Sequence, residues 1–193
     1  MISVIILAAG QSRRMGQPKM LLTWGNFTVI EHVITTFLKA GIDDIVLVTG
    51  GAREQVEKVT AQYPIRRIYN GDYAKGEMLS SLQLGLTAMS AQVQAALIGL
   101  GDQPQVQERS VRLVCEAYRE NKPQLVVPSF QMRRGHPWLV ARPLWGELLE
   151  LKPPESPRDF LNKHAGEIRY VGVNTPSILA DLDTPEDYQK SHP

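Results

Sequence analysis

The sequence predicts an α/β protein whose mostly parallel, Rossmann-like sheet lies between two layers of helices. Short apolar runs alternate with helix-periodic segments along most of the chain, which is the pattern of repeated βαβ units. A glycine-bearing loop follows the first apolar run, at the edge where open α/β sheets bind ligands. The length of 193 residues is that of one domain. We therefore predict a single three-layer α/β/α domain spanning residues 1–193, with a smaller C-terminal lobe.

The individual elements follow from the spacing of apolar residues. The clearest helix is residues 29–40, whose apolar side chains recur with a 3.6-residue period and end before Gly41. Strands are predicted at residues 4–7, 45–48, 65–69, 95–100, 125–128 and 168–173. Further helices are predicted at residues 53–62, 78–89, 107–121, 143–151 and 157–164. After Pro128 the alternation loosens, and residues 131–135 are predicted to form a polar turn between strands.

Composition excludes several classes of protein. The 21 Lys and Arg residues balance 20 Asp and Glu residues, so no broad charge favours nucleic acid or an anionic membrane. The apolar run at residues 4–9 is too short for a signal peptide or a membrane span. A single cysteine cannot form an internal disulfide, so we expect a soluble protein of the reducing cytoplasm. Cys115 lies on an apolar helical stripe and is predicted to be core rather than nucleophile.

The loop at residues 8–19 has the composition of an anion-binding loop. It carries Arg13, Arg14 and Lys19 and no acidic residue, and such side chains neutralise phosphate oxygens. Its small residues allow a ligand to approach the backbone closely. The spacing of Gly10 and Gly16 fits neither G-x-x-x-x-G-K-[ST] nor G-x-G-x-x-G. The alternative is an exposed basic loop without a ligand.

The same loop carries a family resemblance. Its pattern LAAGxSxRMGxxK resembles the signature of nucleotidyltransferases that activate sugars, terpenoid precursors and molybdopterin, and it is most similar to the molybdenum cofactor cytidylyltransferases. Further matches, in the order expected for the family, are Gly76-Glu77-Met78-Leu79-Ser80-Ser81-Leu82, Gly101-Asp102-Gln103-Pro104, Arg134-Gly135-His136-Pro137 and Asp181-Leu182-Asp183-Thr184-Pro185-Glu186-Asp187-Tyr188.

The resemblance implies an activity. CMP would pass from CTP to the phosphate of molybdopterin, the organic part of the molybdenum cofactor, with release of pyrophosphate and with Mg²⁺ as cofactor. Ala9 stands where the related guanylyltransferases usually carry glycine, which favours cytosine as the base. A molybdenum hydroxylase would be the client of the product. Two alternatives remain: transfer to another phosphorylated small molecule, and a non-catalytic protein that binds the cofactor during maturation of a molybdenum hydroxylase.

Two aspartates are candidates for the metal. Asp102 follows the strand at residues 95–100, where a carboxylate can hold Mg²⁺ against phosphates; its structural alternative is a helix cap or an Asx turn. The resemblance implies Asp183 as the second ligand, with Asp181 as its substitute. Thr184 and Asp187 have the spacing of a helix cap.

The remaining assignments also come from the resemblance, which divides the chain into a nucleotide-binding half at about 1–128 and an acceptor half at about 129–193. The predicted catalytic residues are Arg14, Lys19 and Asp102. The predicted nucleotide-binding residues are Leu7, Ala8, Ala9, Gly10, Ser12, Arg14, Lys19, Gly76, Ser80, Ser81 and Asp102. Arg134, Gly135 and His136 are predicted to bind the acceptor. The structural alternatives are that Ser80 and Ser81 only cap their helix and that residues 134–136 form a solvated turn.

Overall fold

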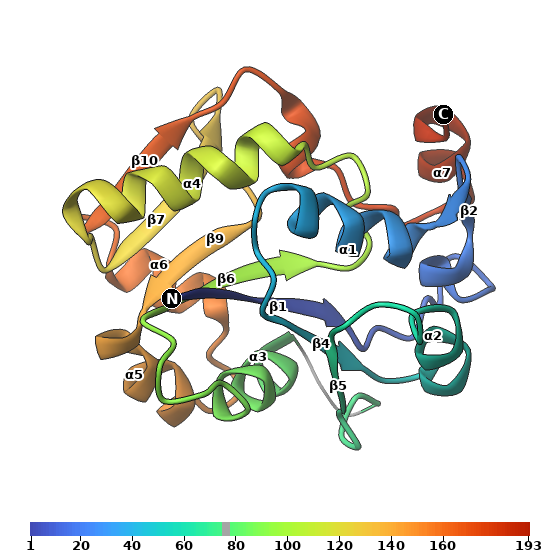
Figure 1. The fold of residues 1–193 in the computed structure, drawn as a ribbon, viewed down its shortest axis with the longest axis horizontal. Helices are drawn as coiled ribbons and strands as arrows, with labels where there is room; N and C mark the ends of the chain where they lie inside the picture. The colour runs from blue at the N-terminus through green and yellow to red at the C-terminus, as the bar shows by residue number, and fades with distance from the viewer. Residues whose placement is uncertain (75–77) are drawn as a thin grey trace.

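The structure of the protein is a computed structural model, which describes residues 1–74 and 78–193 (Figure 1). The strands are β1 (Ile2–Ala8), β2 (Thr23–Trp24), β3 (Phe27–Thr28), β4 (Ile45–Thr49), β5 (Arg66–Tyr69), β6 (Ala95–Leu100), β7 (Leu125–Phe130), β8 (Arg133–Arg134), β9 (Trp138–Ala141) and β10 (Ile168–Gly172). The α-helices are α1 (Val29–Lys39), α2 (Arg53–Val59), α3 (Met78–Thr87), α4 (Glu108–Asn121), α5 (Trp145–Glu150), α6 (Pro157–Lys163) and α7 (Pro185–Ser191). Short 3₁₀ helices are η1 (Lys19–Leu21), η2 (Arg142–Leu144) and η3 (Pro176–Leu179).

The central sheet has eight strands in the order β10-β7-β9-β6-β1-β4-β5, with β8 paired to β7. Strand β1 is parallel to both β6 and β4, β4 is parallel to β5, and β7 is parallel to β10. Among the described strands of this sheet, only β8 and β9 run antiparallel to their neighbours. The predicted mostly parallel α/β fold is therefore confirmed.

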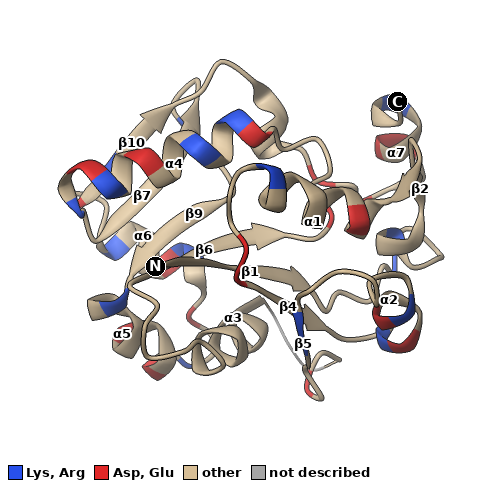
Figure 2. Ribbon diagram, viewed as in Figure 1, with Lys and Arg blue, Asp and Glu red and all other residues tan. Residues whose placement is uncertain are grey.

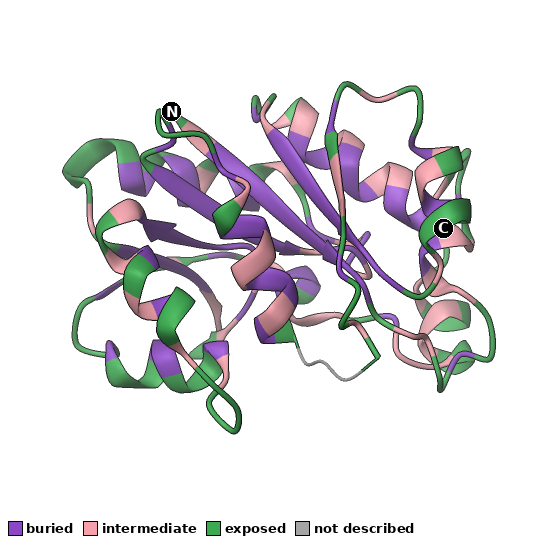
Figure 3. Cartoon of the chain, turned by 90° about the horizontal axis from the view of Figure 1, so that it is seen from below, coloured by how far each residue is buried: buried purple, intermediate pink, exposed green. Residues whose placement is uncertain are grey.

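Helices cover both faces of the sheet (Figure 1). One core cluster joins the sheet to α1 and α4, and the other joins it to α3, α5 and α6. The strands at the centre of the sheet are buried (Figure 3). Strand β1 is buried along nearly its whole length, which explains why its sequence is almost continuously apolar. Charged residues of both signs are interspersed along α2 and α4 (Figure 2). Within the described residues, no helix is long and apolar enough to cross a membrane.

The structure departs from the sequence prediction at several elements. Strand β9 lies antiparallel between β6 and β7, and it was not predicted because its four residues are all buried and show no alternation. The hairpin of β2 and β3 was also not predicted. Helix α2 ends at Val59 rather than at residue 62. The polar turn predicted at residues 131–135 is shorter in the structure: Gln131 and Met132, with positive φ angles, turn between β7 and β8, and β8 itself lies within the predicted range.

Two local predictions are confirmed. Thr184 caps α7, because its hydroxyl accepts from the Asp187 N–H and the Asp187 carboxylate accepts from the Thr184 N–H. Cys115 is buried on α4, and this burial raises the pKa of its thiol to about 11. A thiol that stays protonated at neutral pH is a poor nucleophile, so Cys115 is a core residue.

Candidate active site

The loop that follows β1 is shaped by Ser12. This residue has a φ of 50°, and its carbonyl accepts from the N–H groups of Met15 (3.0 Å) and Gly16 (3.2 Å). Its hydroxyl accepts from the backbone N–H of Lys19 at 3.1 Å. The Met15 side chain is buried, which anchors the middle of the loop. The turn and the buried methionine together set where the Lys19 side chain leaves the backbone.

Close packing beside β1 requires glycine at position 50 and leaves little room for a side chain at position 101. A Cβ on Gly50 would lie 2.4 Å from the Ala9 carbonyl oxygen. A Cβ on Gly101 would lie 3.0 Å from Met20 Sδ and 3.1 Å from Ala8 Cβ. The carboxyl ends of β4 and β6 can therefore approach the loop after β1, which brings the residues that follow three strands to one edge.

The C-terminal segment returns to this edge through a buried leucine. Leu182 is fully buried in a cluster with Met15 and Trp24, and its N–H donates to the Asp102 carbonyl at 3.1 Å. Because Leu182 is held on both its side chain and its backbone, the aspartates on either side of it, Asp181 and Asp183, are placed beside Asp102.

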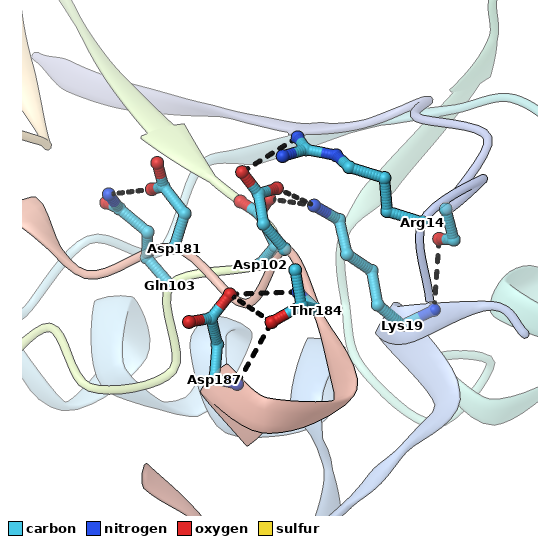
Figure 4. A network of polar contacts seen from close by, with 9 residues as sticks. Arg14, Lys19, Asp102, Gln103, Asp181, Thr184 and Asp187 are labelled. Atoms are coloured by element: carbon cyan, nitrogen blue, oxygen red, sulfur yellow. Dashed lines mark hydrogen bonds and ion pairs between the residues drawn. The ribbon is translucent and has the colours of Figure 1, made fainter. Parts of the chain in front are cut away.

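Basic and acidic side chains from three segments meet in one cluster of ion pairs. The Lys19 ammonium donates to the carboxylates of Asp102 and Asp183, the latter at 3.3 Å. The Arg14 guanidinium donates to Asp183 at 2.9 Å. The Lys19 and Asp102 side chains are only 12% and 15% exposed, whereas Arg14 is 70% exposed. Figure 4 shows Lys19 directed at Asp102, with Arg14 on the same side.

Burial and charge shift the pKa of two groups in this cluster. Burial alone would lower the pKa of the Lys19 ammonium, but the charges and hydrogen bonds of Asp102 and Asp183 outweigh it and raise the pKa. Burial raises the pKa of Asp181, and the charge of Asp102 raises it further. Gln103 opposes that rise by donating from Nε2 to Asp181 Oδ1 at 2.6 Å (Figure 4). Because its pKa is raised, the Lys19 side chain is a cation at neutral pH.

The cluster forms one wall of an open cleft of about 550 Å³. Its lining includes eight residues predicted from the sequence to bind nucleotide, namely Leu7, Ala9, Gly10, Ser12, Arg14, Lys19, Ser81 and Asp102. Both candidate second metal ligands, Asp181 and Asp183, also line it. The volume lies within the range of about 300–1,000 Å³ that is usual for small-molecule sites.

Three of the predicted nucleotide-binding residues are not part of the described cleft lining. Ala8 is buried and faces Gly101, because side chains alternate between the two faces of β1. Ser80 and Ser81 both accept hydrogen bonds from Asn70 Nδ2, at 3.0 and 2.9 Å, but only Ser81 reaches the cleft. Gly76 lies outside the described residues.

The turn predicted to bind the acceptor lies apart from the described lining of the cleft. Arg134 donates to the Tyr170 hydroxyl at 2.9 Å and to Asn162 Oδ1 at 2.8 Å. A Cβ on Gly135 would lie 2.4 Å from the Ile178 carbonyl oxygen, so η3 packs directly on the turn. Burial lowers the pKa of His136 to about 4, although part of the residue stays exposed. The imidazole is therefore neutral at pH 7.

The donor set at Asp102 and Asp183 fits a divalent cation with few protein ligands. Both carboxylates bond the same Lys19 ammonium, so they are close enough to share one small cation. Within the described residues, no group of three or more His, Cys, Asp or Glu side chains could hold a metal. A cation here would complete its shell with phosphate oxygens and water, and Mg²⁺ is usually bound in that way, through one or two carboxylates.

Sequence reasoning missed several residues that line the cleft. These are Gln11, Met20, Tyr73, Ala74, Met78 and Leu100. Tyr73 packs against Gly51, where an added Cβ would lie 3.2 Å from its ring. The available signal was positional, since Tyr73 and Ala74 follow β5 at the same carboxyl edge as the loops after β1 and β6.

Comparisons with known proteins show which family the chain resembles. Residues 4–168 match the model of the MobA-like NTP transferase domain. The chain is 30% identical over 188 residues to the molybdenum cofactor cytidylyltransferase of Escherichia coli K12, covering 97% of this chain and 93% of that protein.

Solved structures extend the likeness to the fold. Rv0371c from Mycobacterium tuberculosis H37Rv, in complex with manganese, has a TM-score of 0.83 at 26% identity, covering 99% of this chain and 97% of that chain. A nucleotidyl transferase from Methanothermobacter thermautotroptrophicus has a TM-score of 0.84 at 25% identity, covering 100% and 96%. The matches span both the loop after β1 and the sheet edge that carries Asp102. The chain belongs to the MobA-like NTP transferase family and is a nucleotidyltransferase.

Proposed function

We propose that the protein transfers CMP from CTP to the phosphate of molybdopterin with bound molybdenum, releasing pyrophosphate. The observation that carries the proposal is the cluster of Lys19, Arg14, Asp102 and Asp183 on one wall of a nucleotide-sized cleft. The similarity to a molybdenum cofactor cytidylyltransferase along 97% of the chain supports the choice of substrates.

The nucleophile in this reaction needs no general base. A phosphate monoester has its second pKa near 6, so it is mostly a dianion at about pH 7. Its oxygen attacks the α-phosphorus of CTP, the bond from that phosphorus to the bridging oxygen breaks, and pyrophosphate leaves with the electron pair. The barrier comes from repulsion between anions and from charge on the leaving group, so positioning and cations supply most of the catalysis.

Each charged residue then has a defined task. Lys19, a mostly buried ammonium with a raised pKa, holds the triphosphate where negative charge develops. Arg14, more exposed, binds the outer phosphate oxygens with its planar guanidinium. Asp102 and Asp183 would hold Mg²⁺, which neutralises phosphate charge when bound. Binding of nucleotide and cation would replace the ion pairs that Lys19 and Arg14 make with these carboxylates.

Ala9 supports cytosine as the base. This residue lines the cleft, and its carbonyl oxygen would lie 2.4 Å from a Cβ on Gly50, so a methyl group would not fit there. The backbone at Ala9 therefore cannot move toward Gly50 to make room for a larger base. Cytosine, with a single ring, requires less space beside Ala9 than guanine does.

The acceptor half supplies the second substrate site in this proposal. The neutral His136 imidazole has no hydrogen-bond partner within the described residues, so it can bond a pterin or its phosphate. To bind the acceptor phosphate, Arg134 would have to give up its hydrogen bonds to Tyr170 and Asn162. The product of the reaction would pass to a molybdenum hydroxylase. The compartment we expect is the reducing cytoplasm, which suits the free thiol of Cys115.

Pyrophosphate release tests the proposal. We expect rapid release only when the protein, a divalent cation, CTP and molybdopterin carrying molybdenum are all present, together with the cytosine dinucleotide as product. Turnover with a different phosphorylated acceptor, but not with molybdopterin, would show that the chain serves another pathway. Binding of both substrates without pyrophosphate release would favour a cofactor-binding maturation protein.

A further inference from the structure

A small pocket lies at the N-terminus of α4, apart from the cleft. It has a volume of about 140 Å³ and is formed by the first turns of α4 and the segment that leaves β10. The two segments lie next to each other at the end of α4 nearest to η3 (Figure 1). Among the described residues, none lines both this pocket and the cleft. Its volume is below the range of about 300–1,000 Å³ of drug-sized ligand sites, so it fits a single small group.

Ser110 gives this pocket a polar wall. The residue is only 2% exposed, lines the pocket, and its hydroxyl has no hydrogen-bond partner among the described residues. It is the third residue of α4, and the Cα–Cβ bonds of a helix tilt toward its N-terminus, so the side chain starts toward the open end of the helix. Among the described residues, Ser110 Oγ is not one of the buried atoms that lack a partner, so its oxygen is reached from the pocket and is available to a ligand that enters it.

The helix end adds further donors. Helix α4 has 14 residues, and its N-cap, Gln107, makes no side-chain capping bond. The Ser110 N–H donates to the Gln107 carbonyl at 2.9 Å, which leaves the N–H groups of Glu108 and Arg109 as donors at the positive end of the helix dipole. Across the pocket, the Thr175 hydroxyl accepts from the Ser177 N–H at 3.2 Å, which leaves its own proton to donate outward.

The charge of the pocket is positive. Arg109 lines it, is exposed, and has no carboxylate partner among the described residues. Glu108, the acid in the first turn, is paired with Arg112 at 2.5 Å and does not line the pocket. The lining, taken over the described part of the chain, therefore contains one cation and no acid.

We propose that this pocket binds one tetrahedral oxyanion of the phosphate class. Its donors are the Arg109 guanidinium, the hydroxyls of Ser110 and Thr175, and the N–H groups of Glu108 and Arg109, a combination that suits phosphate oxygens. The loop between β6 and α4 joins this site to Asp102 in the cleft. The anion is either free inorganic phosphate or the terminal phosphate of a larger molecule that projects from the surface.

Amide chemical shifts of the ¹⁵N-labelled full chain, titrated with inorganic phosphate, test the site. We expect saturable shifts at residues 108–110 and 174–175. The same shifts should persist in Lys19→Ala, which weakens phosphate binding in the cleft. Arg109→Gln should weaken binding about tenfold or more, because charge-assisted bonds are the strong ones. Ser110→Ala, which favours the helix, should weaken it less.

Arg119→Gln is the matched control, since Arg119 is exposed and lies in the last turn of the same helix. It should leave phosphate binding at the pocket unchanged. Equal weakening by Arg109→Gln and Arg119→Gln would overturn the site, and so would phosphate shifts confined to the cleft. Glycerol 3-phosphate separates the two sources: tighter binding than inorganic phosphate assigns the site to a larger molecule, and weaker binding assigns it to the free anion.

Discussion

Lys19 and Asp102 form a mostly buried ion pair across 83 positions of sequence. The lysine begins η1, directly after the first loop, whereas the aspartate follows β6. The pair keeps both charges stable in the low-dielectric wall of the cleft, and Asp183 adds a second carboxylate to the same ammonium. Buried charges need such partners. The arrangement also means that the charge on Asp102 can be tested by a substitution that preserves shape.

Asp102→Asn should abolish most turnover while the chain still folds. The amide has the shape of the carboxylate and can still accept from Lys19, but it lacks the charge that a divalent cation requires. We expect kcat to fall about hundredfold or more, measured as pyrophosphate release at saturating Mg²⁺, with an unchanged circular dichroism spectrum. Asp43→Asn, on an exposed loop, should have no effect. Near-normal turnover of Asp102→Asn would contradict the metal assignment.

Lys19→Ala should lower kcat/KM strongly. The ammonium contributes most where negative charge redistributes in the transition state, so kcat should fall as well as affinity. Steady-state kinetics with CTP separates the two effects. Lys163→Ala is the control, because Lys163 is also ion-paired, to Glu147 at 2.8 Å, but lies on α6. If only KM rises, Lys19 supplies uniform binding and takes no part in the chemical step.

Ala9→Gly should raise the use of GTP modestly. The change removes the methyl group of a residue that lines the cleft, and one methyl is worth about 1–3 kcal/mol of discrimination in a pocket. A complete switch is not expected, because Ser81 and Tyr73 also line this cleft. Competition between CTP and GTP, followed by product analysis, measures the ratio. A wild-type chain that prefers GTP would overturn the assignment of cytosine.

His136 should make the folded chain less stable as the pH falls from 6.5 to about 4. Burial lowers the pKa of this imidazole in the folded chain to about 4 from its ordinary value of 6.5, so the unfolded chain binds more protons between these values. The loss is at most about 3 kcal/mol, and partial exposure of the residue reduces that figure. Urea denaturation of wild type and His136→Gln measures it. Equal pH slopes for the two proteins would show that His136 is not buried in this way.

The amino-acid sequence by itself determined the sheet and the edge at which the site lies. Apolar runs such as Ala95–Leu100 are buried whatever their place in the chain, because exposure of an apolar run to water is unfavourable. Glycine at positions 50 and 101 allows the ends of neighbouring strands to approach closely. The cap at Thr184 is equally local, since its partner Asp187 is three residues away. These features depend on neighbours in sequence, so their patterns are readable there.

Tertiary structure alone decided which side chains reach the cleft. Asp183 meets Lys19 across 164 positions because Leu182 is buried beside Met15. Strand β9 gains its antiparallel place from contacts with β6 and β7 on both sides, and Arg134 turns to Tyr170 rather than to the cleft. The direction of a side chain depends on what its neighbours in space bury and bond, and those neighbours come from distant parts of the chain.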